Sequence, residues 1–397
     1  MRALVIGAGI AGPVTAMALQ KAGLDVTVLE AHARTADDAG AFLTLAPNGL
    51  HALEVLDIDH HDLGGFDTTA LQMRNARGRA LTRLPMDAPG GGLHSQTVRR
   101  ADLYTALRDE AGRRGIAVEH GRRLADVTPG RTGGVVATFE DGTRETGDML
   151  VGADGIGSRT RQVLDPACPA PRYTGLLNTG GYATGVAVDA EPGVFTMVFG
   201  RRAFFAYLCR GPGEVWWFAN IPRTAAATAD ELAAWTPATW RAELERLFAD
   251  DRSPALELLA GTPRLLGPWN TRDLPKVPVW HRGPVGLVGD AAHAISPTSG
   301  QGASLAVEDG VLLARWVRDL GDPAAAFAAF EAQRRRRVER LVAQAKRTSN
   351  LKIPNPLSRA VRDRVVLPAV GRVATRTSRD WVTDFRVTWE ERSAPAR

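Results

Sequence analysis

The N-terminal end of the chain alternates sharply between apolar runs and turn residues. Residues 2–6 form a short apolar run typical of a buried strand, and glycines follow it directly. Residues 11–22 have the apolar spacing of a helix, and residues 25–29 form a second strand-like run. This order predicts a compact βαβ unit.

Both kinds of pattern recur further along the chain. A hairpin turning near Gly78 is expected over residues 71–84, and residues 172–222 alternate as in an antiparallel sheet rich in aromatic side chains. Other strands are predicted at 116–118, 134–139, 148–151 and 286–288. Helices are predicted at 101–113, 237–248, 252–259, 302–319 and 323–347.

The order of these elements predicts an α/β fold in which one nucleotide-binding domain is interrupted by insertions that form a second domain. We expect the nucleotide-binding domain to comprise residues 1–70, 98–171 and 268–350. The inserted sheet domain is expected from residues 71–97 and 172–267, with a C-terminal helical segment and tail at 351–397.

Composition and charge narrow the class of protein. The chain has 397 residues, 44% of them hydrophobic and 23% charged, which is ordinary for a globular protein with a real core. Its net charge of +5 is spread along the chain, so it predicts no nucleic-acid or membrane partner. Neither a signal peptide nor an apolar run of about 18 residues is expected. Cys168 and Cys209 are too few for a disulfide framework, which favours a reducing cytoplasm.

The N-terminal turn carries a dinucleotide-binding fingerprint. Gly7 permits the tight turn, Gly9 lets the backbone approach a pyrophosphate, and Gly12 allows close packing of the helix on the strand. Glu30, at the end of the next strand, can accept hydrogen bonds from a ribose and repels a 2′-phosphate, which favours FAD or NAD as the bound molecule. The alternative is a glycine turn without a ligand.

Two further glycine motifs follow strands. Asp154 comes directly after the run 149–151 and could serve a ligand or merely cap the next helix. Asp290 follows the strand 286–288 and can take a sugar hydroxyl, while the amides of Gly300–Ala303 open a helix that could stabilise an anionic ring. We expect His293 to fill a structural turn.

Together these motifs resemble those of the single-component FAD-dependent aromatic hydroxylases, the group that includes para-hydroxybenzoate hydroxylase. The resemblance spans roughly residues 1–350. It implies a Rossmann-like FAD-binding domain with an inserted antiparallel-sheet substrate domain and C-terminal helices. It also implies a set of residues that contact FAD: Gly7, Gly9, Ile10, Ala11, Gly12, Glu30, Arg100, Leu124, Asp154 with Gly155, Ser158 and Arg161, Asp290, Pro297, Gly300, Gly302 and Ala303.

The resemblance further implies the chemistry. NADPH or NADH reduces the flavin, O2 adds to give a flavin hydroperoxide, and one oxygen atom passes to a small or mid-sized, aromatic or polyketide-like substrate. The segment 217–222 lacks the second tryptophan of the related halogenases, which argues against halogenation. A Baeyer–Villiger or epoxidising enzyme, a non-oxygenating FAD-binding isomerase or cyclase, and an NAD-linked dehydrogenase remain alternatives. The expected assembly is a monomer or homodimer.

Strand alternation suggests a substrate face on the inserted domain. A turn at Gly211–Gly213 joins two predicted strands, 202–209 and 214–221, and one face of this pair should roof the flavin. The candidates on that face are Arg202, Phe204, Trp216, Phe218 and Asn220. Arg202 would be the polar handle among aromatic rings. The alternative is that the aromatic stripe is simply core.

Two charged clusters could bind a phosphate or a metal ion, but each has a simpler structural explanation. We expect Arg334–Arg337 to lie on a solvated helix face, with an NADPH phosphate as the alternative partner. His60 and His61 resemble a metal cluster, but adjacent side chains on a loop rarely converge on one ion. We therefore predict a surface turn there and no metal site in the protein.

Overall fold

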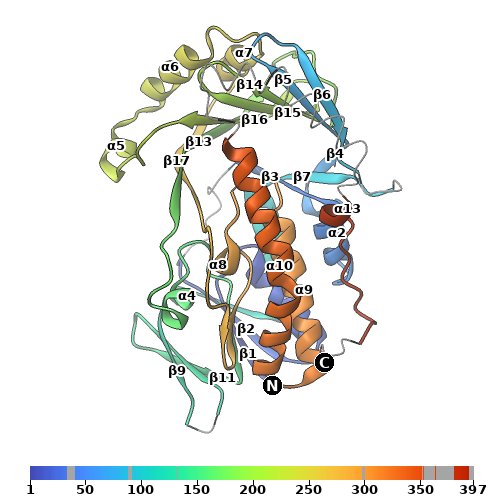
Figure 1. Ribbon diagram of the computed structural model, residues 1–397, viewed down its shortest axis with the longest axis vertical. Coiled ribbons are helices and arrows are strands. Elements are labelled where there is room, and N and C mark those ends of the chain that lie inside the picture. Colours follow the sequence, from blue (N-terminus) through green and yellow to red (C-terminus); the bar gives the residue numbers. More distant parts are fainter. Residues whose placement is uncertain are drawn as a thin grey trace.

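Two large sheets, one above the other in Figure 1, organise the molecule. The computed structural model describes residues 1–33, 41–87, 92–131, 133–296, 300–350, 352, 363 and 380–392. Within this part of the chain, no helix combines the length and the apolar character needed to cross a bilayer. The α/β fold predicted from the sequence is confirmed.

The lower sheet has six strands in the order β18-β19-β12-β1-β2-β8, and β1 pairs in parallel with both β2 and β12. Its apolar runs are buried on both faces, as a parallel core sheet requires. The strands are β1 (Arg2–Ile6), β2 (Asp25–Glu30), β8 (Ala117–His120), β12 (Met149–Gly152), β18 (His281–Arg282) and β19 (Val285–Leu287).

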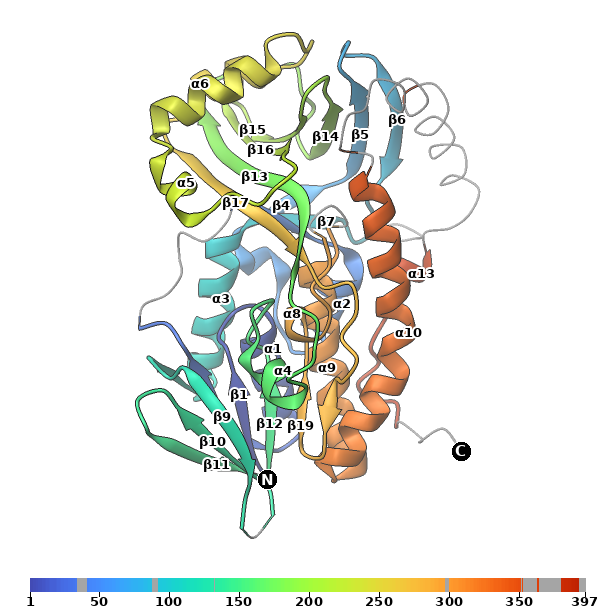
Figure 2. The ribbon, with the colours of Figure 1, turned by 60° about the vertical axis from the view of Figure 1, so that its left-hand side comes forward.

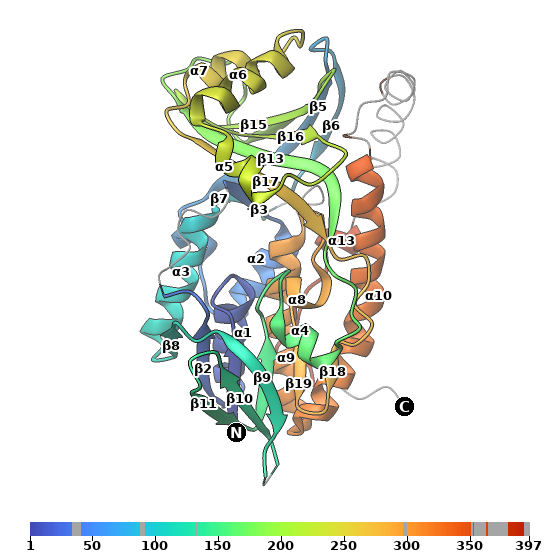
Figure 3. The ribbon, with the colours of Figure 1, turned by 90° about the vertical axis from the view of Figure 1, so that its left-hand side faces the viewer.

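Helices pack around the lower sheet. Helix α9 packs so closely on α1 that a Cβ at Gly310 would lie 3.0 Å from the amide nitrogen of Thr15. Figure 3 shows α3 and α10 on opposite sides of the molecule, with α2 and α8 between them. These helices are α1 (Ala11–Lys21), α2 (Pro47–Glu54), α3 (Arg100–Arg113), α4 (Arg159–Leu164), α8 (Asp290–His293), α9 (Gly302–Leu320) and α10 (Pro323–Asn350), with α13 (Asp380–Thr383) further along the chain.

The upper sheet has seven strands in the order β17-β13-β16-β15-β14-β5-β6. The early hairpin β5–β6 joins it through a parallel pairing with β14, and the remaining pairs are antiparallel. The expected boundary at residue 268 falls inside β17. The strands are β5 (Ala70–Asn75), β6 (Ala80–Pro85), β13 (Arg172–Thr184), β14 (Val194–Phe199), β15 (Phe204–Gly211), β16 (Glu214–Pro222) and β17 (Leu265–Asp273).

The two faces of the upper sheet have different neighbours. Phe205 meets Phe248 of α6 at 5.2 Å between ring centroids, and the indole of Trp217 donates to Thr262 beside α7, so this face packs under helices. Figure 2 shows α6 above the sheet and the lower domain beneath it. The covering helices are α5 (Ala229–Ala234), α6 (Pro237–Phe248) and α7 (Ala255–Ala260).

Two small sheets complete the fold. One, in the order β3-β7-β4, lies between the large sheets, and the other, β11-β10-β9, projects at the lower end of the molecule in Figure 1. Their strands are β3 (Phe42–Leu45), β4 (Phe66–Thr68), β7 (Ser95–Arg99), β9 (Leu124–Pro129), β10 (Val135–Phe139) and β11 (Arg144–Gly147). A short 3-10 helix, His60–Leu63, precedes β4.

Candidate functional site

The three glycines of the first fingerprint have different surroundings. A Cβ on Gly7 would lie 2.7 Å from the carbonyl oxygen of Ala153, and one on Gly12 would lie 1.8 Å from the carbonyl oxygen of Gly7. A Cβ on Gly9 would meet no atom within 4 Å. Gly7 and Gly12 are therefore required by packing of the protein on itself, whereas Gly9 leaves open space where a pyrophosphate could approach.

Glu30 lies at the carboxyl end of β2, beside this turn. Its carboxylate accepts hydrogen bonds from the amide of Ala8 at 2.6 Å and from the amide of His32 at 2.9 Å. These bonds fix the carboxylate at the strand end where a ribose would have to lie. Its predicted role toward the cofactor fits this position.

The Asp154 loop lies directly against the first fingerprint, because the Cα of Asp154 is 3.0 Å from where a Gly7 Cβ would be. The carboxylate accepts from the Ser158 hydroxyl at 2.5 Å and from the Thr160 amide at 2.9 Å, so it orders its own loop. Ser158, not Asp154, caps α4 by accepting from the amide of Arg161. Contact between Asp154 and FAD stays a prediction.

Arg161 joins the Asp154 loop to the motif that begins at Gly289 and Asp290. The guanidinium is buried and donates to the carbonyl oxygens of Ile156 at 2.6 Å and Ala291 at 3.0 Å. The third motif also touches the first, since a Cβ on Gly289 would lie 3.0 Å from the Cβ of Ala11. Segments separated by more than a hundred positions in the sequence therefore meet at one edge of the lower sheet.

Arg100 and Asp290 are close enough to interact electrostatically across this edge. Burial raises the pKa of Asp290 above its ordinary value, and the positive charges of His293 and Arg100 oppose that rise. The guanidinium of Arg100 also receives support from Tyr104, whose hydroxyl oxygen accepts from Nε at 2.6 Å. One cation and one carboxylate therefore lie near each other at this edge, and their contact with the phosphates and sugar hydroxyls of FAD stays a prediction.

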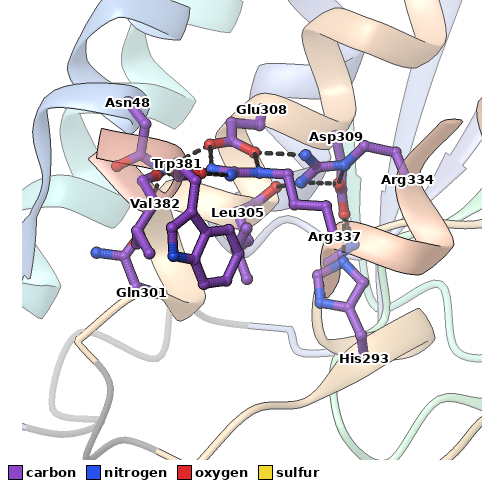
Figure 4. A network of polar contacts seen from close by, with 11 residues as sticks. Asn48, His293, Gln301, Leu305, Glu308, Asp309, Arg334, Arg337, Trp381 and Val382 are labelled. Atoms are coloured by element: carbon purple, nitrogen blue, oxygen red, sulfur yellow. Dashed lines mark hydrogen bonds and ion pairs between the residues drawn. The ribbon is translucent and has the colours of Figure 1, made fainter. Parts of the chain in front are cut away.

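The third motif rests on a buried ion network, shown in Figure 4. Asp309 of α9 accepts from the amide of Gly289 at 2.9 Å and pairs with the His293 imidazole at 2.5 Å. Burial alone would raise the pKa of Asp309, but the charges of His293 and Arg334 lower it to about 2. His293 thus contacts a structural carboxylate under the Asp290 turn, as expected from the sequence.

The prediction that Arg334–Arg337 form a solvated face holds only for Arg336, and Arg335 is half-buried and donates to the carbonyl oxygens of Val277 and Pro278. Arg334 is fully buried and pairs with both Glu308 and Asp309 of α9. Arg337 pairs with Glu308 at 2.9 Å and donates to the carbonyl oxygen of Val382. Carboxylates on the facing helix neutralise Arg334 inside the protein, so it has no exposed charge for an NADPH phosphate.

The remaining predicted cofactor contacts are placed in part. Gly300 has φ 63°, and a Cβ there would meet no atom within 4 Å. Gly302 begins α9, where the nearest atom to its Cβ would be a methyl of Ile295 at 3.5 Å. Leu124 begins β9 opposite Phe139 and is buried. Pro297 lies outside the described residues.

The predicted aromatic face exists and is turned toward the lower domain. The strand register pairs Phe204 with Asn220 and Leu208 with Trp216, which confirms that the predicted residues of β15 and β16 share one face. Trp216 meets Phe66 of β4 at 5.0 Å and Phe42 of β3 at 5.7 Å between ring centroids. That this face binds substrate stays a prediction.

Arg202 does not belong to the aromatic face. It precedes the first residue of β15, and its guanidinium pairs with Asp250 at 2.6 Å and donates to the carbonyl oxygen of Arg246. Both partners lie at the end of α6, on the helix-covered side of the sheet. The alternation argument failed here because the strand starts later than predicted, so the pleat does not extend to residue 202.

A cation that the sequence analysis missed does reach the aromatic face. Lys352, two positions after α10, is buried and donates from Nζ to Oδ1 of Asn220 at 2.7 Å. No periodic pattern pointed to this residue, because it follows the end of a helix.

The histidine pair forms part of an exposed turn. The ligand atoms of Asp59, His60 and His61 lie within 4.8 Å of one another, so the argument that neighbouring side chains would not converge is wrong as geometry. The Asp59 carboxylate, however, already accepts from the amide of His61 at 2.9 Å and caps the 3-10 helix. The predicted turn is therefore present, and the absence of a metal there stays a prediction.

Removing the carboxylate of Asp290 should lower FAD occupancy. The D290A variant loses a charged acceptor for a sugar hydroxyl, which is worth roughly 1.5–3 kcal/mol, or about 10–100-fold in affinity. Titration of the apoprotein with FAD measures the change. The D290N variant keeps an oxygen acceptor, so its affinity for FAD should lie between those of the wild type and D290A. An unchanged dissociation constant in D290A would contradict this placement of the site.

Comparison with known proteins agrees with this geometry. Residues 1–345 match the family described as FAD binding domain. The chain is 31% identical over 357 residues to an FAD-dependent urate hydroxylase of Klebsiella pneumoniae, covering 88% of this chain and 90% of that protein. It is 29% identical to a 6-hydroxynicotinate 3-monooxygenase of Bordetella bronchiseptica, covering 86% of this chain and 89% of the relative.

A solved structure extends the likeness to three dimensions. The crystal structure of Klebsiella pneumoniae HpxO complexed with FAD and uric acid matches with a TM-score of 0.82 at 29% identity, over 95% of each chain. The open space at Gly9 and Gly300 and the facing pair Arg100 and Asp290 fit FAD. The chain therefore belongs to the FAD-dependent aromatic hydroxylases and is an FAD-dependent monooxygenase.

Proposed function

We propose that this enzyme hydroxylates a small planar aromatic compound, using O2 and either NADPH or NADH. One observation carries the proposal: the carbonyl oxygen of Ala41 accepts from the amide of Arg100 at 3.1 Å and from the hydroxyl of Tyr182 at 2.7 Å. Tyr182 in turn meets Trp216 at 5.3 Å between ring centroids. The cofactor edge and the aromatic face are thus connected through a single backbone group.

Each part of this arrangement has a task in hydroxylation. Bound FAD supplies electron transfer from the nicotinamide and delivery of one oxygen atom from O2. Arg100 and Asp290 would hold its polar parts, and the amides at the start of α9 would stabilise negative charge on the ring. The partly exposed rings of Phe42 and Phe218 would exclude water and orient a flat substrate by stacking, supported by the buried ring of Trp216.

The named substrates of the relatives support a planar ligand. Urate and 6-hydroxynicotinate are both flat heteroaromatic compounds that carry ionisable oxygens. Aromatic side chains bind such rings through their faces. We therefore propose a substrate of this shape for the present enzyme.

Substrate-stimulated oxidation of NADPH tests the proposal. We expect a hydroxylatable planar aromatic compound to accelerate NADPH oxidation and oxygen uptake at least tenfold over the ligand-free holoenzyme, with a product heavier by one oxygen atom. NADH in a parallel assay decides the nicotinamide preference. NMR of the product separates hydroxylation from Baeyer–Villiger insertion or epoxidation. If no planar aromatic compound stimulated oxygen uptake, a non-oxygenating FAD-binding protein would be the better description.

The cellular setting follows from the thiols. Cys168 and Cys209 are both free, and neither approaches the other in sequence or in the fold closely enough to be paired. We infer a reducing environment such as the cytoplasm. We also propose that the enzyme acts as a monomer or homodimer, which size-exclusion chromatography with light scattering would test.

A further inference from the structure

Lys352 lies under the aromatic face of the upper sheet, beyond the end of α10. Its ammonium nitrogen is 3.9 Å from the ring centroid of Phe204 and 5.3 Å from that of Phe218, within the range of cation–π attraction. The same nitrogen donates to Asn220. Figure 1 shows α10 rising from the lower domain to end near β13 and β16, and Lys352 is two positions past that end.

Asn220 is oriented to receive this cation. Its amide nitrogen donates to Oδ1 of Asn178 on β13 at 3.0 Å, so its oxygen is left to face Lys352. The result is a polar line, Asn178–Asn220–Lys352, on a face whose other side chains are mainly aromatic and aliphatic. The side-chain amides of Asn178 and Asn220 thus hold the amine of Lys352 in a defined position above the phenyl rings.

The lysine is buried without a balancing charge. Its side chain is only 3% exposed, and no carboxylate among the described residues pairs with it. An ammonium group has three N–H donors, and the described acceptors take one of them. Burial lowers the pKa of Lys352 to about 7. A buried cation with spare donors is unfavourable in the free protein, so an anionic partner would stabilise it strongly.

We propose that Lys352 is the specificity residue of this enzyme, and that it binds an ionised oxygen (a carboxylate, phenolate or enolate) on the aromatic substrate. The inference rests on the proposed function, because it takes the aromatic face as the substrate site. The partly exposed ring of Phe218 holds the flat part of the molecule, and Lys352 with Asn220 holds the charged end. The enzyme therefore selects aromatic anions over neutral compounds of the same shape.

A purely structural role predicts a different result for substrate binding. If Lys352 served only to fill space, replacing it with methionine, which has a similar length and no charge, would leave the preference for anions unchanged. Buried ionic groups replaced by apolar side chains often leave a protein more stable. We therefore expect the K352M variant to have a higher Tm than the ligand-free wild type while losing selectivity for anions.

Binding to the intact holoenzyme, followed by the absorbance change of the bound flavin, tests the proposal. The probes are benzoate and salicylate, with benzamide and salicylamide as neutral counterparts of the same shape. In the wild type we expect the anions to bind at least tenfold more tightly than the amides. This ratio should fall to about one in K352M, return in K352R, and also fall in N220D, where a new carboxylate neutralises the lysine. K276M, which removes an exposed lysine, is the matched control and should keep the wild-type ratio.

A pH series adds an independent readout. Only an amide and two phenyl rings contact the Lys352 nitrogen among the described groups. In the ligand-free enzyme the pKa of Lys352 is about 7, so the side chain loses its positive charge as the pH rises from 7 to 9. The affinity of the wild type for benzoate should therefore fall over this range. It should stay flat in K352R, since a guanidinium keeps its charge over this range.

The outcomes separate this inference from the proposed function. Equal binding of anions and amides by the wild type, or an unchanged ratio in K352M, would overturn the role of Lys352 and leave hydroxylation of a neutral aromatic compound standing. If neither anions nor amides bound to the wild-type holoenzyme, the role of Lys352 would be overturned as well. Hydroxylation would then be decided separately by substrate-stimulated oxidation of NADPH.

Discussion

A methyl group at position 12 should abolish FAD binding and destabilise the N-terminal βαβ unit. The Cβ of the G12A variant would lie 1.8 Å from the carbonyl oxygen and 3.0 Å from the carbonyl carbon of Gly7, and neither backbone atom can rotate away. The first turn of α1 would have to move off β1. Overpacking of this kind costs about 3 kcal/mol at the upper end of its usual range. We expect a colourless protein with a clearly lowered Tm.

Gly9 offers a matched control on the same turn. The G9A variant adds the same methyl group where no protein atom lies within 4 Å, so the apoprotein should keep the wild-type Tm. Its affinity for FAD should nonetheless fall at least tenfold, because the methyl group occupies the approach of the pyrophosphate. Flavin absorbance after gel filtration and thermal melting of the apoproteins give both quantities. Normal FAD content in G9A would refute the placement of the diphosphate at this turn.

The sequence predicts well those features that depend on local backbone geometry. The turn between β1 and α1 requires glycines at fixed spacing, so the motif can be recognised in one short segment of the sequence. The alternation in β15 and β16 works for the same reason, because pleating assigns Phe204 and Phe218 to one face whatever lies beyond the sheet. Both predictions concern neighbours along the chain.

Features that depend on a distant partner were not predicted. Arg334 looks like part of a solvated arginine run until α9 places Glu308 and Asp309 opposite it. Lys352 has no pattern of its own, and its position depends on where α10 ends relative to β16. The error at Arg202 began locally, because β15 starts at Phe204, but the partner of its side chain, Asp250, also comes from a later segment.

Replacing Arg334 should be the most damaging change outside the cofactor turn. The R334M variant leaves the carboxylates of Glu308 and Asp309 buried, and both side chains have zero exposure. Breaking a buried ion pair by removing one partner typically costs about 3–5 kcal/mol, because the remaining charge stays uncompensated. Arg337 still neutralises Glu308, whereas Asp309 keeps only His293. The loss of stabilising charge in R334M should therefore be greater at Asp309 than at Glu308.

That asymmetry carries the effect into the cofactor site. Asp309 holds the amide of Gly289 at 2.9 Å, and Asp290 is the next residue, so a displaced Asp309 also displaces the carboxylate that would bind the sugar of FAD. We expect R334M to show both a lower Tm as apoprotein and weaker FAD binding, whereas R336M, which removes an exposed neighbour on the same helix, should change stability by less than about 0.5 kcal/mol. R334K should lie between them, because an ammonium keeps the charge but cannot make the forked contact to two carboxylates. Melting curves equal for R334M and R336M would show that the buried network does not support the turn.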